Sequence, residues 1–188
     1  MSDHFLEVHS ANWEERSLRT PDERLRLEPL TREHATEMAE VLKDPSLNEQ
    51  IDGEPPNAEY LATRYQALST RRSLGGDELW FNWIIRLNDE GLAVGYVQAT
   101  VRDNSAALAW VIGSPWQGAG IATEAATAMI GVLHHELAVT RFSASIAPKN
   151  WASRKVAAKL GMRRSGMVDD GEDVWIVHLP APTRNYQE

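Results

Sequence analysis

The chain contains no cysteine among its 188 residues. Disulfide bonds, thiolate metal sites and a cysteine nucleophile are therefore excluded. It also lacks an apolar run close to the roughly 20 residues that a membrane-spanning helix needs. The segment 1–20 is polar and acidic and does not resemble a signal peptide. From these absences we expect a cytoplasmic protein.

Basic residues are scarce: 19 Lys and Arg stand against 27 Asp and Glu, for a formal net charge of −8. A nucleic-acid binder normally carries a basic face, so nucleic acid is not an expected partner. The acidic balance suits a cationic substrate, although acidity for solubility alone explains it equally well. His134 and His135 are adjacent and would point to different helix faces, so no metal site is expected.

A chain of this length suits one domain with a full core. Residues 1–20 show no clear period, and we expect an irregular arm there. We expect a single α/β domain over residues 21–180 and a short tail over 181–188.

The first part of the chain alternates between strand and helix patterns. Arg24–Glu28 alternates polar and apolar residues, as a half-buried strand does. Thr31 can cap a helix that Asp44-Pro45 ends, and Asn57 can cap a second helix in a segment that Gly75-Gly76 ends. Three strands at residues 79–87, 93–101 and 106–112, separated by turn residues, then predict an antiparallel meander.

The second part predicts a strand–helix–strand unit. A loop with Gly and Pro follows residue 112, a helix runs to about Leu137, and Arg141–Ile146 forms the next strand. Strands joined through a helix are expected to be parallel. Asn150 caps a last helix, and strands at 162–168 and 173–179 close the fold. The expected fold is a mixed, mostly antiparallel sheet with a central parallel pair, flanked by helices.

The small-residue loop before the long helix is a candidate anion site. Unpaired N–H groups and the helix dipole favour negative charge at such a helix start. Small side chains let a diphosphate approach the backbone. The Gly-Lys-Ser/Thr ending of a Walker loop and the third glycine of a dinucleotide loop are both missing. On spacing alone, a plain tight turn is the alternative. The loop reads Gln117-Gly118-Ala119-Gly120-Ile121-Ala122.

These residues resemble the coenzyme A loop of the GNAT superfamily of N-acetyltransferases, whose pattern is Gln/Arg-x-x-Gly-x-Gly/Ala. The ribosomal-protein-alanine/serine acetyltransferase branch is most similar. Its pattern is matched in order by Trp110, Trp116, Gly118, Gly120, Ala122, Thr123, Glu124 and Ala125. A second motif of that branch is matched by Asn150, Ser153 and Lys159-Leu160-Gly161-Met162. The resemblance covers about residues 24 to 179.

The resemblance implies acetyl-CoA as co-substrate, without a metal. It implies that strands 106–112 and 141–146 splay apart after a bulge and admit the pantetheine arm. Asn150 would hydrogen-bond that arm. The other implied coenzyme-binding residues are Trp110, Val111, Ile112, Gln117, Gly118, Ala119, Gly120, Ile121, Ala122, Thr123 and Ser153. The implied acceptor is an amine, on a protein N-terminus or a small cationic molecule. Homodimers are common in the family, and no sequence signal decides the question here.

The implied reaction is direct attack of a neutral amine on the acetyl thioester. Many members use a tyrosine to protonate the leaving thiolate, and Ala157 occupies that position here. In the resembled branch a serine has this role, which implies Ser153 as the general acid. Alternatively, Ser153 only binds the coenzyme or caps its helix.

The general base is not identified by the pattern. The branch often carries a glutamate in the strand that corresponds to residues 106–112, which has no carboxylate here. The remaining candidates are Asp52, Glu54, Glu78, Asp169, Asp170, Glu172 and Asp173. The last four could equally form an electrostatic funnel for a cation. Trp80 and Trp83 should lie on opposite faces of one strand, one in the core and the other along the acceptor groove.

Two other functions remain open from the sequence. The missing tyrosine and the missing strand glutamate would suit a non-catalytic CoA-binding sensor or partner-binding module. An unrelated nucleotide-binding enzyme is the third possibility.

Overall fold

The computed structural model describes residues 17–48 and 55–182. Its strands are β1 (Leu18–Arg19), β2 (Leu25–Pro29), β3 (Leu79–Leu87), β4 (Ala93–Arg102), β5 (Ser105–Ile112), β6 (Arg141–Ile146), β7 (Arg163–Asp169) and β8 (Glu172–His178). Its helices are α1 (Ala35–Val41), α2 (Pro45–Asn48), α3 (Ala58–Leu68), α4 (Ile121–Leu137) and α5 (Trp151–Lys159), with short 3-10 turns η2 (Arg32–His34) and η3 (Ser114–Trp116).

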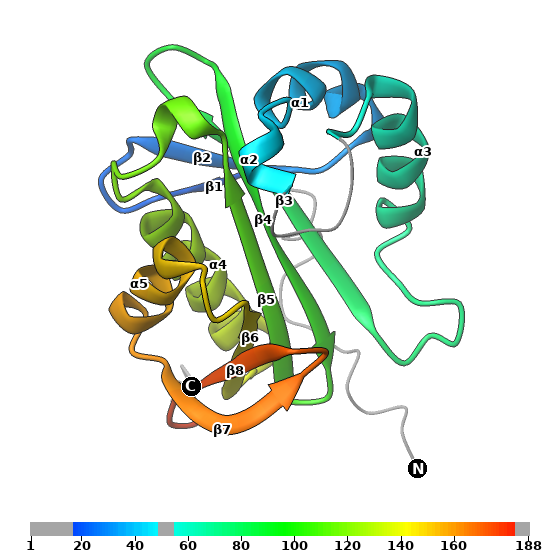
Figure 1. Cartoon of the computed structure of the whole chain (residues 1–188). Coiled ribbons are helices and arrows are strands. Elements are labelled where there is room, and N and C mark those ends of the chain that lie inside the picture. Colours follow the sequence, from blue (N-terminus) through cyan, green and yellow to red (C-terminus); the bar gives the residue numbers. More distant parts are fainter. Residues whose placement is uncertain (1–16, 49–54, 183–188) are drawn as a thin grey trace.

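The strands form one sheet in the order β1-β2-β3-β4-β5-β6-β8-β7 (Figure 1). The expected meander is confirmed, because β3, β4 and β5 pair antiparallel. The expected parallel pair is also confirmed in β5 and β6, with α4 as the crossover between them. The sheet is thus mixed and mostly antiparallel, as the periodicity predicts.

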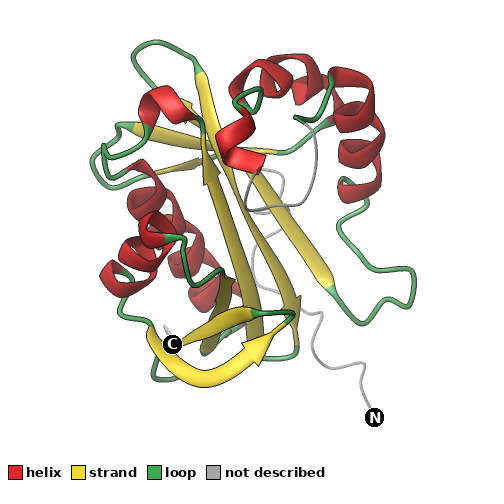
Figure 2. Ribbon diagram, viewed as in Figure 1, coloured by secondary structure: helices red, strands yellow, loops and turns green. Residues whose placement is uncertain are grey.

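Helices cover both faces of this sheet (Figure 2). One face packs against α4 and α5 through a large apolar cluster that includes Trp83, Phe142 and Met129. The other face packs against α1 and α3 through a smaller cluster around Ile84 and Met38. The expected separation of the strand's two tryptophans holds: Trp83 is only 1% exposed, whereas Trp80 on the opposite face is half-buried.

The first helix ends at Val41, before Asp44-Pro45 as predicted, but Pro45 also begins a short helix, α2, that the sequence pattern did not predict. A fixed proline φ suits a first helical position, and the Asp44 carboxylate accepts the Ser46 N–H at 2.9 Å. The second helix begins after its Asn57 cap, as predicted, and ends at Leu68.

The expected irregular segment over residues 1–20 is also wrong at its end, because Leu18–Arg19 pair with β2. Thr20 follows and is only 1% exposed. The rest of that segment lies outside the described residues. The same is true of Asp52 and Glu54, two of the candidate bases.

The parallel pair opens into a gap. The ladder between β5 and β6 has three pairs and ends at Ala107–Ser143, after which the strands separate. The expected splay is therefore confirmed. The expected bulge is not in this strand: the β4–β5 register runs without a shift from Gly95–Ile112 to Arg102–Ser105. Register shifts lie instead between Ile85 and Arg86, where β3 meets β4, and between Arg164 and Val168, where β7 meets β8.

Candidate active site

The open edge of β5 can pair with an extended ligand. The Gly113 N–H donates to the Val94 carbonyl at 2.9 Å. This bond shows which residues of β5 direct their backbone N–H and C=O toward β4 and which direct them away from it. In an antiparallel pair with this register, the backbone groups of Trp110 and Ile112 point away from β4. Beyond the end of the parallel ladder, that direction is the gap. Trp110 thus presents both an N–H and a C=O there, and Ile112 presents an N–H.

The loop that follows β5 has the shape of an anion site. Gly118 and Gly120 have φ of 79° and 80°, and a Cβ at either would meet nothing within 4 Å. These glycines are therefore needed for their conformation rather than for space. The first helical bond of α4 runs from the Glu124 N–H to the Gly120 carbonyl at 3.1 Å. The three preceding helical N–H groups, of Ile121, Ala122 and Thr123, have no partner within the helix.

Gln117 joins the loop to the open strand edge. Its Nε2 donates to the Ile112 carbonyl at 3.0 Å. Of the two Ile112 backbone groups that face the gap, the carbonyl is therefore occupied by Gln117, and the N–H is left for a ligand. The loop and the gap are therefore neighbouring parts of one surface. A ligand with an anionic group and an extended arm can contact both.

Helix α5 begins beside this gap, directly after β6. The Asn150 Oδ1 accepts the Ser153 N–H at 3.0 Å and caps the helix, which leaves the Asn150 amide nitrogen available as a donor. Ser153 is half-buried and lies one turn before Ala157, which is fully buried. Among the described residues, the Ser153 hydroxyl has no hydrogen-bond partner. The structure therefore offers a serine hydroxyl, and no tyrosine, on this helix face.

On the side of α1 and α3, part of the sheet face carries small and polar residues. The register aligns Asn82, Gln98 and Ala109 across β3, β4 and β5. The next row contains Trp80, Thr100, Ala107, Ser143 and Ile176. All of these side chains are at least partly exposed. The helices instead cover the row above, which contains Ile84, Tyr96 and Val111. Burial raises the pKa of the Tyr96 hydroxyl, so that group stays neutral and is no candidate base.

One candidate carboxylate lies over this open face. The Asp169 Oδ2 accepts a hydrogen bond from the Ser145 hydroxyl at 3.3 Å. Ser145 is on β6, which borders the gap, and it is exposed on the face opposite to α4. Glu172 lies directly opposite Asp169 in the backbone register of the β7–β8 hairpin. The hairpin therefore places two carboxylates at the border of the open face.

The other described candidates have different surroundings. Asp173 is 7% exposed and pairs with Arg164 at 2.5 Å. Glu78 pairs with Arg102 at 2.9 Å and accepts the Trp80 Nε1–H at 3.2 Å. Asp170 forms the hairpin turn with φ of 45°. Asp173 and Glu78 are thus held by cations, whereas within the described part of the chain Asp169 has only a hydroxyl partner.

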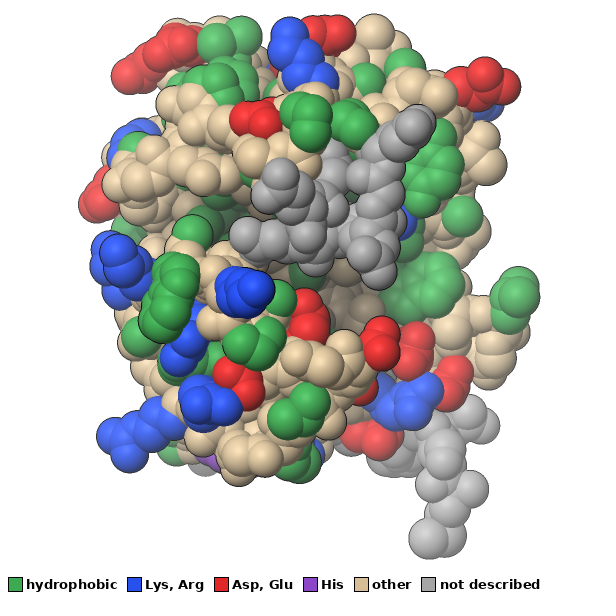
Figure 3. All heavy atoms as spheres, in the orientation of Figure 1, with side chains coloured by type: hydrophobic (Ala, Val, Ile, Leu, Met, Phe, Trp, Pro, Cys, Tyr) green, Lys and Arg blue, Asp and Glu red, His purple; other side chains and the backbone are tan. Residues whose placement is uncertain are grey.

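Charges of opposite sign gather on different parts of the surface. Residues 142–168 contain no acidic residue, although the whole chain is acidic. The basic residues of this stretch are Lys149, Arg154, Lys155, Lys159, Arg163 and Arg164. Figure 3 shows Lys and Arg side chains around α5 and β7, and Asp and Glu side chains gathered nearer the start of β3. The sequence reasoning missed this stretch, which a local count of charges would have found.

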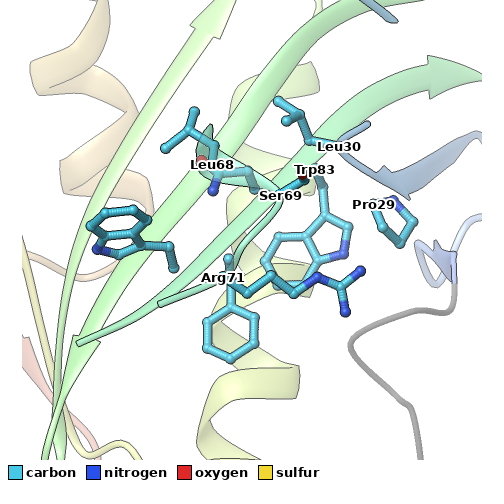
Figure 4. A pocket seen from close by; sticks show the side chains of 9 residues that line it. Pro29, Leu30, Leu68, Ser69, Arg71 and Trp83 are labelled. Carbon is cyan, nitrogen blue, oxygen red and sulfur yellow. The ribbon is translucent and has the colours of Figure 1, made fainter. Parts of the chain in front are cut away.

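A small pocket lies at the edge of the sheet, beyond the end of β2 (Figure 4). Its volume of about 10 Å³ has room for about one water molecule. Its lining residues are Pro29, Leu30, Leu68, Ser69, Arg71, Trp80, Phe81, Asn82 and Trp83.

Within residues 17–48 and 55–182, no group of three or more His, Asp or Glu side chains could hold a metal ion. No helix there has both the length and the apolar character to cross a bilayer.

Comparisons with known proteins bear on this geometry. A family model described as "Acetyltransferase (GNAT) domain" matches residues 24–163. The uncharacterized N-acetyltransferase YnaD of Bacillus subtilis is 30% identical over 95 residues, which are 47% of this chain and 56% of that protein. The chain thus matches little more than half the length of this curated relative.

Solved structures share the fold. An acetyltransferase of the GNAT family from Bacillus anthracis has a TM-score of 0.70 and 20% identity, over 87% of this chain and 98% of that chain. RimJ from Mycobacterium smegmatis, solved in complex with CoA-disulfide, has a TM-score of 0.69 and 21% identity, over 87% and 86%. At these identities the likeness concerns the arrangement of helices and strands.

Proposed function

Because the chain belongs to the GNAT family of acetyltransferases, we propose that it transfers the acetyl group of acetyl-CoA to a primary amine. The observation that carries the proposal is the hydrogen bond from Gln117 to the Ile112 carbonyl, at 3.0 Å. It joins an anion-binding helix start to an unpaired strand edge. A coenzyme with a pyrophosphate and an amide-containing arm matches both surfaces at once.

In this proposal the pyrophosphate binds the N–H groups between Gly118 and Thr123, at the start of α4. The pantetheine arm lies in the gap and pairs with the Trp110 backbone as an added strand would. Asn150 donates its amide N–H to the arm. Neighbouring Lys and Arg side chains of α5 add attraction for the phosphates.

The acetyl group then lies near the end of β5, facing the open sheet surface. The neutral amine attacks the thioester carbon, and a β5 N–H stabilises the resulting oxyanion. Collapse of the tetrahedral intermediate breaks the carbon–sulfur bond and releases the CoA thiolate. Asp169 accepts the amine proton, directly or through a water molecule, and Ser153 protonates the thiolate.

The acceptor lies on the uncovered face over β4, β5 and β6. Carboxylates of the β7–β8 hairpin and of the segment before β3 border this face, which favours a cation. A protein N-terminus and a small cationic amine both meet this requirement.

The test is the release of free thiol from acetyl-CoA across a panel of amines. The panel contains peptides with N-terminal alanine or serine, a polyamine and an aminoglycoside. We expect turnover with at least one class. CoA binding without turnover on any amine would support the non-catalytic module instead. A melting temperature raised by ATP or NAD but not by CoA would indicate an unrelated nucleotide-binding enzyme.

Replacing Ser153 with alanine should lower kcat by about 10- to 100-fold, because the thiolate loses its proton donor. The KM for acetyl-CoA should change little, since the backbone contacts remain. Steady-state kinetics with the best amine of the panel measure both constants. Thr127→Ala is the matched control, because it removes an exposed helical hydroxyl that bonds only the Thr123 carbonyl. Full turnover by Ser153→Ala would limit this serine to coenzyme binding or helix capping.

A further inference from the structure

An ion pair ties the start of β2 to the first turn of α4. The Arg24 Nε and Nη2 donate to the Glu124 Oε2 at 2.9 and 2.5 Å. The Thr20 hydroxyl donates to the other oxygen, Oε1, at 2.5 Å. The side chain of Glu124 is only 15% exposed. Both oxygens of this carboxylate are therefore held from the β1–β2 hairpin.

The same arginine also holds the loop itself. The Arg24 Nη1 donates to the Ala119 carbonyl at 3.2 Å. A trans peptide directs its C=O and its N–H in opposite directions. Fixing the Ala119 carbonyl toward Arg24 therefore turns the N–H of exposed Gly120 away from Arg24, on the side open to a ligand. Arg24 thus sets the direction of one donor of the anion site from behind.

Charge gives Arg24 a second effect. Glu124 lies in the first turn of α4, next to the N–H groups that are proposed to bind a pyrophosphate. An uncompensated carboxylate there would repel the coenzyme. The Arg24 guanidinium neutralises it at short range, so the helix start keeps its attraction for anions.

The hairpin that carries Arg24 is itself fixed. Buried Thr20 accepts the Leu25 N–H at 3.2 Å, and the Glu23 N–H donates to the Thr20 carbonyl at 2.8 Å. The Asn88 N–H donates to the Arg24 carbonyl at 3.0 Å. The guanidinium therefore extends from a hairpin that the sheet holds in place.

We propose that Arg24 is a positioning residue for the coenzyme's pyrophosphate, which it influences through Ala119 and Glu124 without touching the phosphates. This inference rests on the proposed function. It predicts a defect specific to donors that carry the pyrophosphate. A donor that lacks the phosphates should react with an Arg24 variant as well as it reacts with the wild type.

The experiment compares acetyl-CoA with S-acetylpantetheine, which has the same arm and thioester but no phosphate. In Arg24→Gln we expect the Kd for acetyl-CoA to rise by about tenfold, as for loss of charge-assisted hydrogen bonds. The kcat/KM for S-acetylpantetheine should stay as in the wild type. Adding Glu124→Gln to Arg24→Gln should recover part of the lost affinity, because the repelling charge is removed.

Arg19→Gln is the matched control, since it removes the same charge from the same hairpin but its partner is exposed Glu23 at 3.9 Å. It should bind acetyl-CoA as the wild type does. Arg24→Lys keeps the charge and should show a smaller defect. It replaces Arg24→Gln in the comparison if Arg24→Gln folds poorly. Equal losses for both donors, or no loss for acetyl-CoA, would refute the positioning role. Wild-type protein that binds no acetyl-CoA would refute the proposed function itself.

Discussion

Replacing Asp169 with asparagine is expected to lower kcat by about 100-fold or more at pH 7, the usual contribution of a general base. Asparagine keeps an oxygen that can accept the Ser145 hydroxyl, so the hairpin should stay in place. It cannot take up the proton of the incoming amine. Because amines become neutral by themselves above their own pKa of about 8 to 10, the activity of the variant should recover as the pH rises.

Asp170→Asn is the control, because it removes the same charge from the adjacent turn residue. Its kcat should stay within about twofold of the wild type if the hairpin acts only through Asp169. Equal losses in both variants would instead indicate an electrostatic funnel, and KM for the amine would then rise more than kcat falls. An unchanged Asp169→Asn together with an inactive Glu78→Gln would assign the base to Glu78.

The second large effect concerns stability. Arg86 joins β3 to β2 and α1: its Nε pairs with Glu28 at 2.8 Å, and its two terminal nitrogens pair with Glu37 at 2.8 and 3.0 Å. The Arg86 side chain is only 13% exposed. Arg86→Met would leave two partly buried carboxylates without this cation. We expect the free energy of unfolding to fall by about 2 kcal/mol, measured by urea denaturation.

The pH dependence of this network has a definite sign. Arg86 hydrogen bonds lower the pKa of Glu37. Burial alone would raise the pKa of Glu28, but hydrogen bonding and the charge of Arg86 bring it below 4.5. Carboxylates with a lowered folded-state pKa contribute stability above the unfolded pKa, and lose it as pH falls through the folded pKa. The difference in unfolding free energy between wild type and Arg86→Met should therefore be largest near pH 7 and should decrease below about pH 4.

Lys43→Met serves as the control, since Lys43 and Glu40 form a pair that is about three-quarters exposed on both sides. Its cost should be below about 0.5 kcal/mol. If the difference in unfolding free energy between wild type and Arg86→Met stays constant from pH 7 to pH 3, lost packing rather than lost ion pairing causes the destabilisation.

Much of the geometry of the proposed donor half could be predicted from the sequence, because most of its determinants are local. Gly118 and Gly120 lie directly before the helix that they begin, and glycine readily adopts the left-handed φ values found there. Asn150 caps α5 through a residue only three positions away. Such contacts depend on neighbouring residues alone, so a pattern in one stretch predicts them.

The acceptor half depends on contacts between distant residues. Ser145 and Asp169 are 24 positions apart, and they meet across strands β6 and β7, which both pair with β8. One contact of the proposed donor half is equally distant in sequence, since Arg24 and Glu124 are 100 positions apart. No pattern within a single sequence indicates that the two residues of either pair are in contact. The short helix at Pro45 was missed for a different reason, because proline both ends one helix and suits the start of the next.

The separation of β5 from β6 has a kinetic consequence. In the proposed arrangement, donor and acceptor approach the gap from different sides of the same sheet, so neither has to leave before the other enters. Without a cysteine, and with the direct attack of the amine on the thioester that we propose, the acetyl group need not be carried covalently by the protein. Initial rates measured against both substrates should give intersecting reciprocal lines, as expected for a ternary complex, and not the parallel lines of a ping-pong enzyme.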